Sequence, residues 1–199
     1  MYYVNKSIIN IFLMSKVLLE VPYHSQLNNK YNPTGSCNVT SAAMVVKYVY
    51  RKYDKNNKWL DKFPAYREQQ LEDEMYRVMR SLGLSRHSPH DISTMIGLYG
   101  VQSRFDEFAT IAEVKKHLDS GYPVICHGYF TSFGHIIVFV GYDDDKETFI
   151  VHDPYGEYWS NGYDNSKSGE NLEYSYNLIR RTCIESDKSF WIHFVKGLK

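Results

Sequence analysis

The sequence predicts an α+β fold, in which a mainly helical part is followed by an antiparallel β-sheet. Apolar residues recur at helical spacing over about residues 37–120, and short β-rich runs separated by turn residues occupy about 122–197. The two kinds of segment do not alternate, which disfavours a parallel βαβ arrangement. The chain has 199 residues, enough for one sizeable core. We therefore expect residues 16–199 to form a single domain and residues 1–15 to be a dispensable N-terminal extension.

The chain should open with a strand, a loop and a long helix. Residues 17–23 are typical of a short strand that a proline ends, and the polar residues 24–36 are typical of a loop. From Cys37 to Tyr53 the apolar residues fall at helical spacing, and Ser36 is the expected N-cap residue.

Three further helices are predicted by apolar spacing and by end signals, so that residues 59–120 should be mostly helical. The segment 66–82 precedes Gly83, a residue suited to the end of a helix. The segment "SPHDISTMIGLYG" has a serine cap followed by a proline, and "TIAEVKKHLDSG" has a capping box formed by Thr110 and Glu113.

Four β-rich runs follow these helices: "PVICHGYF", "HIIVFVGYD", "TFIVHDPY" and "FWIHFVKG". We expect residues 136–142 and 148–152 to form one hairpin with its tip at 143–147. The polar, tyrosine-rich segment 156–176 fits either a flap over a cleft or a surface loop.

The composition argues against several classes of function. The chain carries 23 basic and 23 acidic residues, whereas binding to nucleic acid or to an anionic membrane requires a basic excess. Its three cysteines are odd in number and widely spaced, which disfavours a disulfide framework or a structural zinc site and favours a reducing compartment. The apolar run Ile8–Met14 is too short to cross a membrane and lacks a signal-peptide cleavage site, so we expect a cytoplasmic or phage-encoded protein.

Cys37 is the first candidate for chemistry because it lies where the long helix begins. Backbone N–H groups and the helix dipole at that point favour the thiolate, which is the nucleophilic form of cysteine. The alternative is a small buried residue. Cys126 is not a candidate, because an apolar strand interior raises the pKa of a thiol.

His135 and Asp153 are candidates because of the predicted hairpin. His135 opens the most apolar strand and Asp153 follows the next one, so both lie at the open end of the hairpin and can be neighbours. A carboxylate in that position would orient the imidazole of a general base. Alternatively, His135 faces solvent and Asp153 caps the turn before Pro154, while His152 points to the opposite face and is a lesser candidate.

Gln26 lies eleven residues before Cys37, on the loop that leads to the helix. Its side-chain amide could donate a hydrogen bond to an oxyanion beside the N–H of Cys37. The alternative is a loop glutamine that faces water.

The order of these residues along the chain resembles that of the papain-like cysteine peptidases, and most closely that of the C39-like peptidase family. The matching segments are "VPYHSQL", "GSCNVTSAAMVV", "GHIIVFVGYDDD" and "VHDPYG", whereas residues 55–110 match only in their helical character. The resemblance implies a papain-like fold in which Cys37 is the nucleophile and His135 is the general base. It further implies that Asp153 orients His135 and that Gln26 lines the oxyanion hole.

Asn38 departs from the family pattern, which has glycine at that position ("CGPTS" in place of "CNVTS"). The added side chain stands beside the nucleophile, so Asn38 is a candidate substrate contact, together with Gly134 next to His135. Relatives that process bacteriocins are joined to transporter segments that this sequence lacks, so we do not expect cleavage of a leader peptide during export.

The resulting prediction is a cysteine peptidase that hydrolyses peptide or amide bonds through a Cys–His–Asp triad and an acyl-enzyme thioester. It requires no metal or organic cofactor, and its expected partner is a peptide or protein substrate. Neither nucleic acid nor a membrane is an expected partner. Two alternatives stay open: an amidase or endopeptidase that cleaves peptidoglycan peptides, as bacterial or phage lytic enzymes do, and a catalytically inactive papain-like binding module.

Overall fold

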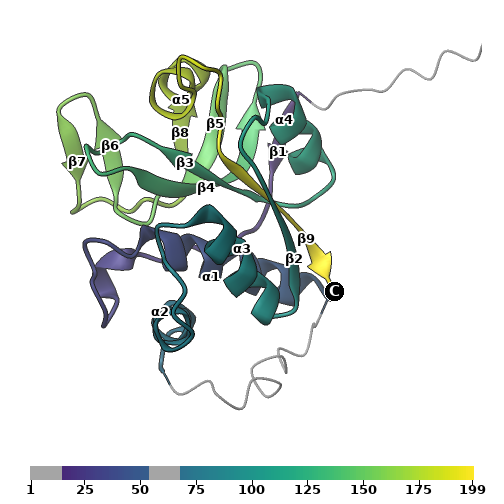
Figure 1. Cartoon of the computed structure of the whole chain (residues 1–199). Coiled ribbons are helices and arrows are strands. Elements are labelled where there is room, and N and C mark those ends of the chain that lie inside the picture. The colour runs from purple at the N-terminus through teal and green to yellow at the C-terminus, as the bar shows by residue number, and fades with distance from the viewer. Residues whose placement is uncertain (1–14, 54–67) are drawn as a thin grey trace, which may run out of the picture.

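The computed structural model describes residues 15–53 and 68–199, and it has the predicted α+β architecture (Figure 1). The expected extension 1–15 lies almost entirely outside these residues. The main sheet has the strand order β2-β9-β3-β4-β5-β8, and β1 pairs with the C-terminal end of β4. All of these pairs are antiparallel. Its strands are β1 (Lys16–Leu18), β2 (Val101–Asp106), β3 (Val124–Gly128), β4 (His135–Asp143), β5 (Thr148–His152), β8 (Leu172–Ser175) and β9 (Ile192–Leu198).

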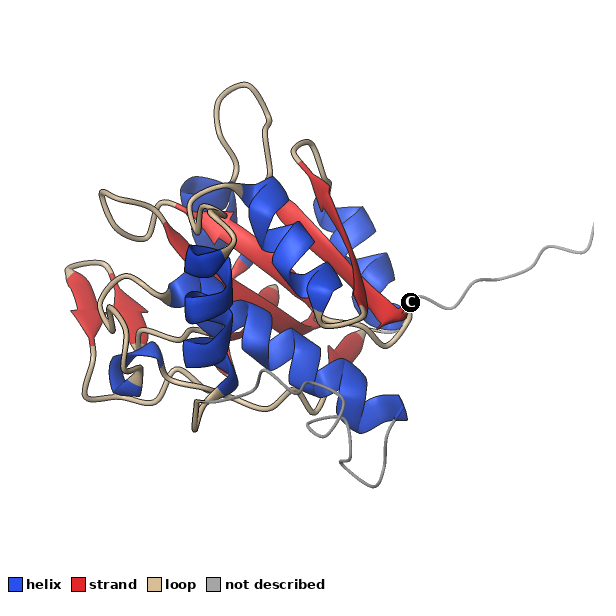
Figure 2. Ribbon diagram, turned by 60° about the horizontal axis from the view of Figure 1, so that its bottom comes forward, coloured by secondary structure: helices blue, strands red, loops and turns tan. Residues whose placement is uncertain are grey.

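Helices cover both faces of the sheet (Figures 1 and 2). One face carries α1 (Cys37–Tyr53), α2 (Leu71–Ser81) and α3 (Pro89–Leu98). The other face carries α4 (Ile111–Asp119) and α5 (Tyr176–Cys183). A turn of 3₁₀ helix, η1 (Gln26–Asn28), precedes α1, and a separate hairpin is formed by β6 (Glu157–Trp159) and β7 (Gly162–Asp164). Within the part of the chain that is described, no helix has the length and apolarity needed to span a bilayer.

The most apolar run of the sequence forms the central strand β4. Ile136 and Val138 pack into the core under α1, whereas Ile137 and Phe139 pack into the core on the opposite face. Because helices cover both faces, every residue of β4 is buried and the strand does not need alternating polar residues. His135 occupies the first position of this rigid, fully enclosed strand.

The predicted ends of α3 and α4 are confirmed. Ser88 caps α3 through its side chain, and Thr110 and Glu113 form the reciprocal capping box of α4. Ser36 directly precedes α1, as expected, but its hydroxyl donates to the carbonyl of Asn32 at 2.8 Å. The serine therefore braces the loop before α1 as well as opening the helix.

The structure also corrects the predicted secondary structure. The region expected to be mostly helical contains the strand β2, which lies at the edge of the sheet and buries only Val101, so its sequence carries no apolar alternation. The first strand ends at Leu18, earlier than the predicted 17–23. The segment 156–176 contributes three strands, β6, β7 and β8, and α5 follows where no helix was predicted. Part of the predicted helical range, residues 54–67, lies outside the described residues.

Candidate active site

Helix α1 places Cys37 at its first position, with the side chain partly exposed. The first turn contains no acidic residue that would offset the positive end of the helix dipole. One turn into the helix, the hydroxyl of Ser41 donates to the carbonyl of Ile136 at 3.2 Å. Because Ile136 follows His135, this bond fixes the helix that carries the cysteine against the strand that carries the histidine.

The loop before α1 is held by a buried hydrogen-bond network. The side-chain amide of Asn29 donates to the hydroxyl of Ser36 at 3.0 Å and to the hydroxyl of Thr40 at 2.9 Å. All three residues are buried, so these bonds are made away from water. The network joins η1 to the first turn of α1 and thereby fixes the backbone on which Cys37 stands.

His135 and Asp153 lie together at the open end of the β4–β5 hairpin. The two atoms His135 Nε2 and Asp153 Oδ1 are 2.7 Å apart, and both residues are buried. The backbone N–H of Tyr155 donates to the same carboxylate oxygen at 3.0 Å. The predicted proximity is therefore confirmed, and the alternative in which His135 faces solvent is wrong.

Two tyrosines complete the hydrogen bonding of Asp153, and the sequence analysis missed both. The Oδ2 atom accepts hydrogen bonds from the hydroxyls of Tyr163 at 2.9 Å and Tyr174 at 3.0 Å. The carboxylate is fully buried, and a buried charge is tolerated only where hydrogen-bond donors replace water. The signal in the sequence was the abundance of tyrosine between residues 156 and 176, a segment that supports the carboxylate.

Gly169 allows the chain to pass close behind Asp153. The N–H of Asp153 donates to the carbonyl of Gly169 at 2.8 Å, and a Cβ atom added at Gly169 would lie 1.7 Å from the carbonyl oxygen of Asp153. The hydroxyl of Tyr23 donates to the carbonyl of Asp153 at 3.3 Å and accepts from the N–H of Gly169 at 3.1 Å. Segments far apart in the sequence thus set the position of Asp153 jointly.

The electrostatic surroundings favour a protonated His135. Burial alone would lower the pKa of His135, but the Asp153 carboxylate and the hydrogen bond with Cys37 outweigh it and raise this pKa to about 10. Because Nε2 faces Asp153, Nδ1 is the nitrogen left to interact with the Cys37 sulfur. The rings of Phe130 and Tyr163 lie edge-on to the imidazole, with centroids 6.1 Å and 5.4 Å away, and they fix its orientation.

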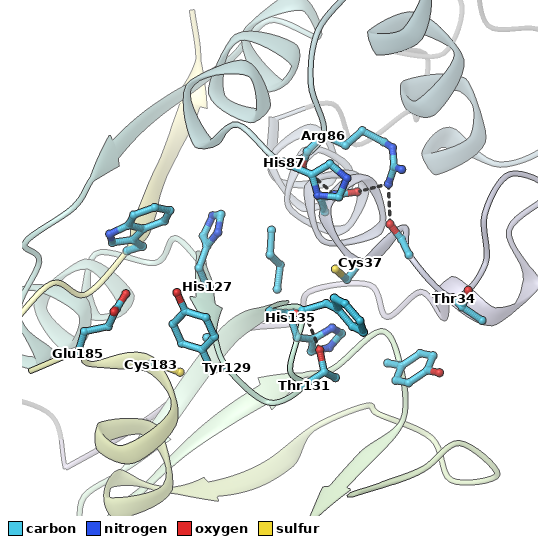
Figure 3. Close-up of a pocket in the computed structure, with 18 residues that line it drawn as sticks. Thr34, Cys37, Arg86, His87, His127, Tyr129, Thr131, His135, Cys183 and Glu185 are labelled. Carbon is cyan, nitrogen blue, oxygen red and sulfur yellow. Dashed lines mark hydrogen bonds between the residues drawn. The ribbon is translucent and has the colours of Figure 1, made fainter.

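Cys37 and His135 line one cavity of about 420 Å³ (Figure 3). Asn38 and Gly134, the predicted substrate contacts, line the same cavity. Gly134 has a φ of +80°, a conformation that favours glycine, and its carbonyl accepts a hydrogen bond from the hydroxyl of Thr131 at 2.8 Å. The structure therefore brings these four candidates to one solvent-connected site, with Asp153 bound to His135.

Asn38 is committed to the protein through its side chain. Its Nδ2 atom donates to the carbonyl of Arg86 at 2.7 Å, and its Oδ1 atom accepts from the N–H of Val39 at 2.9 Å. Arg86 in turn donates to the carbonyl of Gly35 at 2.5 Å. Asn38 therefore joins the start of α1 to the loop before α3 and shapes the cavity wall at this point.

Gln26 is buried beside the loop before α1 and is not among the residues that line the cavity. Its Nε2 atom donates to the carbonyl of Pro33 at 2.9 Å, and its backbone N–H donates to the carbonyl of Pro154 at 2.8 Å. Its Oε1 atom has no hydrogen-bond partner within the described chain. The alternative in which this glutamine faces water is wrong, and one of its two amide protons remains for another acceptor.

A cysteine at a helix start, facing a histidine–carboxylate pair on a sheet, is the arrangement that the sequence resemblance implied. The sequence profile of the family described as "Peptidase_C39 like family" matches residues 18–184, which is most of the chain. The chain belongs to this family. It is therefore a cysteine-type peptidase, and the resemblance noted in the sequence is confirmed.

Solved structures show the same fold in other C39-like and papain-like cysteine peptidases. A double glycine motif protease from an AMS/PCAT transporter, in complex with the leader peptide, is 19% identical with a TM-score of 0.51, covering 91% of this chain and 94% of that one. A C39-like peptidase candidate from Bacillus anthracis is 17% identical with a TM-score of 0.53, and the match covers 92% of this chain and 99% of that one. Xylellain, a cysteine protease from Xylella fastidiosa, is 16% identical with a TM-score of 0.52, and the match covers 100% of this chain and 91% of that one. No curated protein sequence matches the chain.

In this C39-like peptidase, Cys126 and His152 belong to the core. Cys126 is fully buried, and burial together with the neighbouring Cys183 raises the pKa of its thiol well above the ordinary value. The His152 Nδ1 atom accepts from the N–H of Asn171 at 3.1 Å, so Nε2 carries the proton and donates to the carbonyl of Val21 at 2.8 Å. Both nitrogens of His152 are therefore used within the protein.

Proposed function

We propose that this peptidase hydrolyses peptide bonds through a catalytic triad. Cys37 is the nucleophile, His135 is the general acid and base, and Asp153 orients His135. The observation that carries the proposal is the 2.7 Å contact between His135 and Asp153 beside the cavity that Cys37 and His135 both line. The proposed substrate is a peptide or a protein, and a structural neighbour crystallised with a leader peptide supports that class.

The proposed reaction has two halves. At rest Nδ1 of His135 holds a proton, as its raised pKa favours, and the sulfur of Cys37 attacks the carbonyl carbon of the scissile bond as a thiolate. The C–N bond breaks as His135 passes that proton to the leaving amine, and the acyl group stays on sulfur as a thioester. A water molecule then gives a proton to His135 and attacks the thioester, and the C–S bond breaks, which releases the carboxylic acid and restores the thiolate beside the protonated His135. Water is the only co-reactant that these steps consume.

The tetrahedral intermediates place a negative charge on the former carbonyl oxygen, which needs hydrogen-bond donors. We assign this role to the backbone N–H of Cys37 and to the side-chain amide of Gln26. Gln26 uses one amide proton on the carbonyl of Pro33, so a second proton is free to donate.

The nucleophile is tested with Cys37→Ser. We expect this variant to lose at least about 1,000-fold in kcat/KM on a mixture of internally quenched peptides, because a serine hydroxyl is a far weaker nucleophile beside the same imidazole. It should also lose its modification by iodoacetamide at residue 37, as read by mass spectrometry. Cys126→Ala is the matched control, since it removes a buried thiol outside the cavity.

The same experiment separates the alternatives. Peptide cleavage by Cys37→Ser at the rate of the unmodified chain would refute the nucleophile assignment. An inactive binding module would cleave no peptide, and its Cys37 would react with iodoacetamide no faster than a free cysteine does. Clearing of purified bacterial cell walls without cleavage of ordinary peptides would identify a peptidoglycan peptide as the substrate.

A further inference from the structure

The cavity extends well beyond the catalytic pair. On the side away from Thr34 and Arg86, its lining includes His127, Tyr129 and Glu185, and these labelled side chains lie together in the left half of Figure 3. Trp191 also lines the cavity. We call the part of the cavity lined by His127, Tyr129, Glu185 and Trp191 the acidic arm.

Glu185 gives the acidic arm a negative charge that is not neutralised. Its backbone accepts from Lys188 and donates to Ser189 within a turn, but no salt bridge of the described residues involves its carboxylate. The cation on the opposite side of the cavity, Arg86, is engaged with the carbonyl of Gly35. The carboxylate is exposed to the cavity mouth, where it can meet a cation on a ligand.

The neighbouring histidines do not cancel this charge. The Nε2 atoms of His127 and His193 are 2.8 Å apart, so they share one proton and cannot both carry one there. The Nδ1 atom of His193 is 2.9 Å from the hydroxyl of Ser93, which completes a buried chain of hydrogen bonds. Burial lowers the pKa of His127 to about 4. At neutral pH the arm therefore keeps the single negative charge of Glu185.

The aromatic residues of the arm add two kinds of contact. Tyr129 is 62% exposed and presents its ring to the cavity, where it is available for a cation. Trp191 is held by edge-on contacts with Phe105 and His127, with centroids 5.7 Å and 5.9 Å away. Trp191 therefore gives the arm a fixed apolar wall, against which the aliphatic part of a long side chain can pack.

We propose that the acidic arm binds a lysine or arginine side chain of the peptide substrate, close to the scissile bond. The ammonium or guanidinium group pairs with the carboxylate of Glu185 and packs against the ring of Tyr129. The aliphatic part of the same side chain packs against the ring of Trp191. This inference rests on the proposed peptidase function, and it names the substrate feature that the site selects.

The test compares matched peptides on the full chain. Internally quenched peptides carry lysine, arginine, norleucine or glutamate at each position around the cleaved bond, and norleucine keeps the four-carbon chain of lysine without its ammonium group. At one position we expect lysine and arginine to exceed norleucine by about tenfold in kcat/KM, and Glu185→Gln to reduce that ratio to about twofold or less. Glu185→Lys should make glutamate the preferred residue at that position. Glu20→Gln, at an exposed glutamate outside the cavity, should leave the ratio unchanged.

A second variant isolates the contact between the cation and the aromatic ring. Tyr129→Leu keeps an apolar side chain at an exposed position but removes the ring, so it should lower kcat/KM more for the lysine peptide than for the norleucine peptide. Cleavage without a preference for basic residues, or a preference that Glu185→Gln leaves intact, overturns this inference while the peptidase assignment stands. If the chain cleaves none of the peptides although iodoacetamide modifies Cys37, the proposed function itself fails, and this inference fails with it.

Discussion

Replacement of Asp153 by asparagine separates the charge of this residue from its geometry. Asparagine keeps an oxygen that accepts from His135 Nε2 and from the N–H of Tyr155. Its amide nitrogen would face the hydroxyls of Tyr163 and Tyr174, which can rotate to accept instead of donate. The variant should therefore fold and keep the orientation of the imidazole, while the negative charge behind it is lost.

The structure gives the size of the expected effect. His135 has a pKa of about 10, against an ordinary value of 6.5. At 1.36 kcal/mol per pKa unit, the surroundings favour the imidazolium by roughly 5 kcal/mol, against the opposing effect of burial. In Asp153→Asn the Coulombic attraction of the carboxylate is gone and burial remains. The pKa of His135 should then fall from about 10 toward its ordinary value.

Three measurements follow the change. Titration of the imidazole nitrogens by two-dimensional NMR should show the transition of His135 at lower pH in the variant, and the alkaline limb of kcat/KM should move in the same direction.

The folded state of the native chain binds a proton at His135 that the unfolded chain loses above pH 6.5, so this contribution to stability is complete below pH 6.5 and disappears as the pH rises through about 10. The free energy of unfolding, measured with urea, should therefore fall less over this range in the variant. An unchanged titration of His135 would refute the electrostatic role assigned to Asp153.

Two further predictions concern the support of the carboxylate. Tyr163→Phe and Tyr174→Phe each remove one hydrogen-bond donor to the buried carboxylate of Asp153. Each should therefore lower the free energy of unfolding, measured with urea, by about 1.5–3 kcal/mol. An unchanged free energy of unfolding would contradict these buried hydrogen bonds. Gly169→Ala places a Cβ atom 1.7 Å from the carbonyl oxygen of Asp153, so it should destabilise the fold by more than Gly83→Ala does. At Gly83 no atom beyond the adjacent residues lies within 4 Å of the added Cβ, and only backbone strain of about 1–2 kcal/mol is expected. Equal losses in the two alanine variants, measured by thermal unfolding, would show that the chain can move apart behind the carboxylate.

The parts of the site that were predictable from the sequence depend on short-range geometry. The capping signals of α3 and α4 act within one turn of helix, and both were found where the sequence placed them. The proximity of His135 and Asp153 follows from the hairpin, because both residues lie at its open end, where diagonal neighbours on adjacent strands are within reach of each other. The position of Cys37 at the start of α1 follows from the polar loop that ends at Ser36 and from the helical spacing after it.

The parts that were not predictable depend on long-range packing. Tyr163 reaches Asp153 only because the β6–β7 hairpin folds back over it, and Tyr174 reaches it only because β8 pairs with β5. Neither pairing leaves a mark in local apolar spacing, since these strands are short and half exposed. Glu185 and Trp191 join the cavity for a similar reason, because the turn before β9 brings them to the end of β3.

The tyrosines also decide between the two predicted forms of the segment 156–176. The ring of Tyr163 lies against His135 and its hydroxyl binds Asp153, so lifting the β6–β7 hairpin would strip a donor from a fully buried carboxylate. A lost hydrogen bond to a charged group costs about 1.5–3 kcal/mol, and the same movement would uncover the imidazole. A flap that opens in each turnover would therefore disturb the histidine it covers. Under the proposed mechanism, substrate reaches Cys37 through the cavity that extends between Arg86 and Glu185, and the hairpin is a fixed wall behind His135 and Asp153.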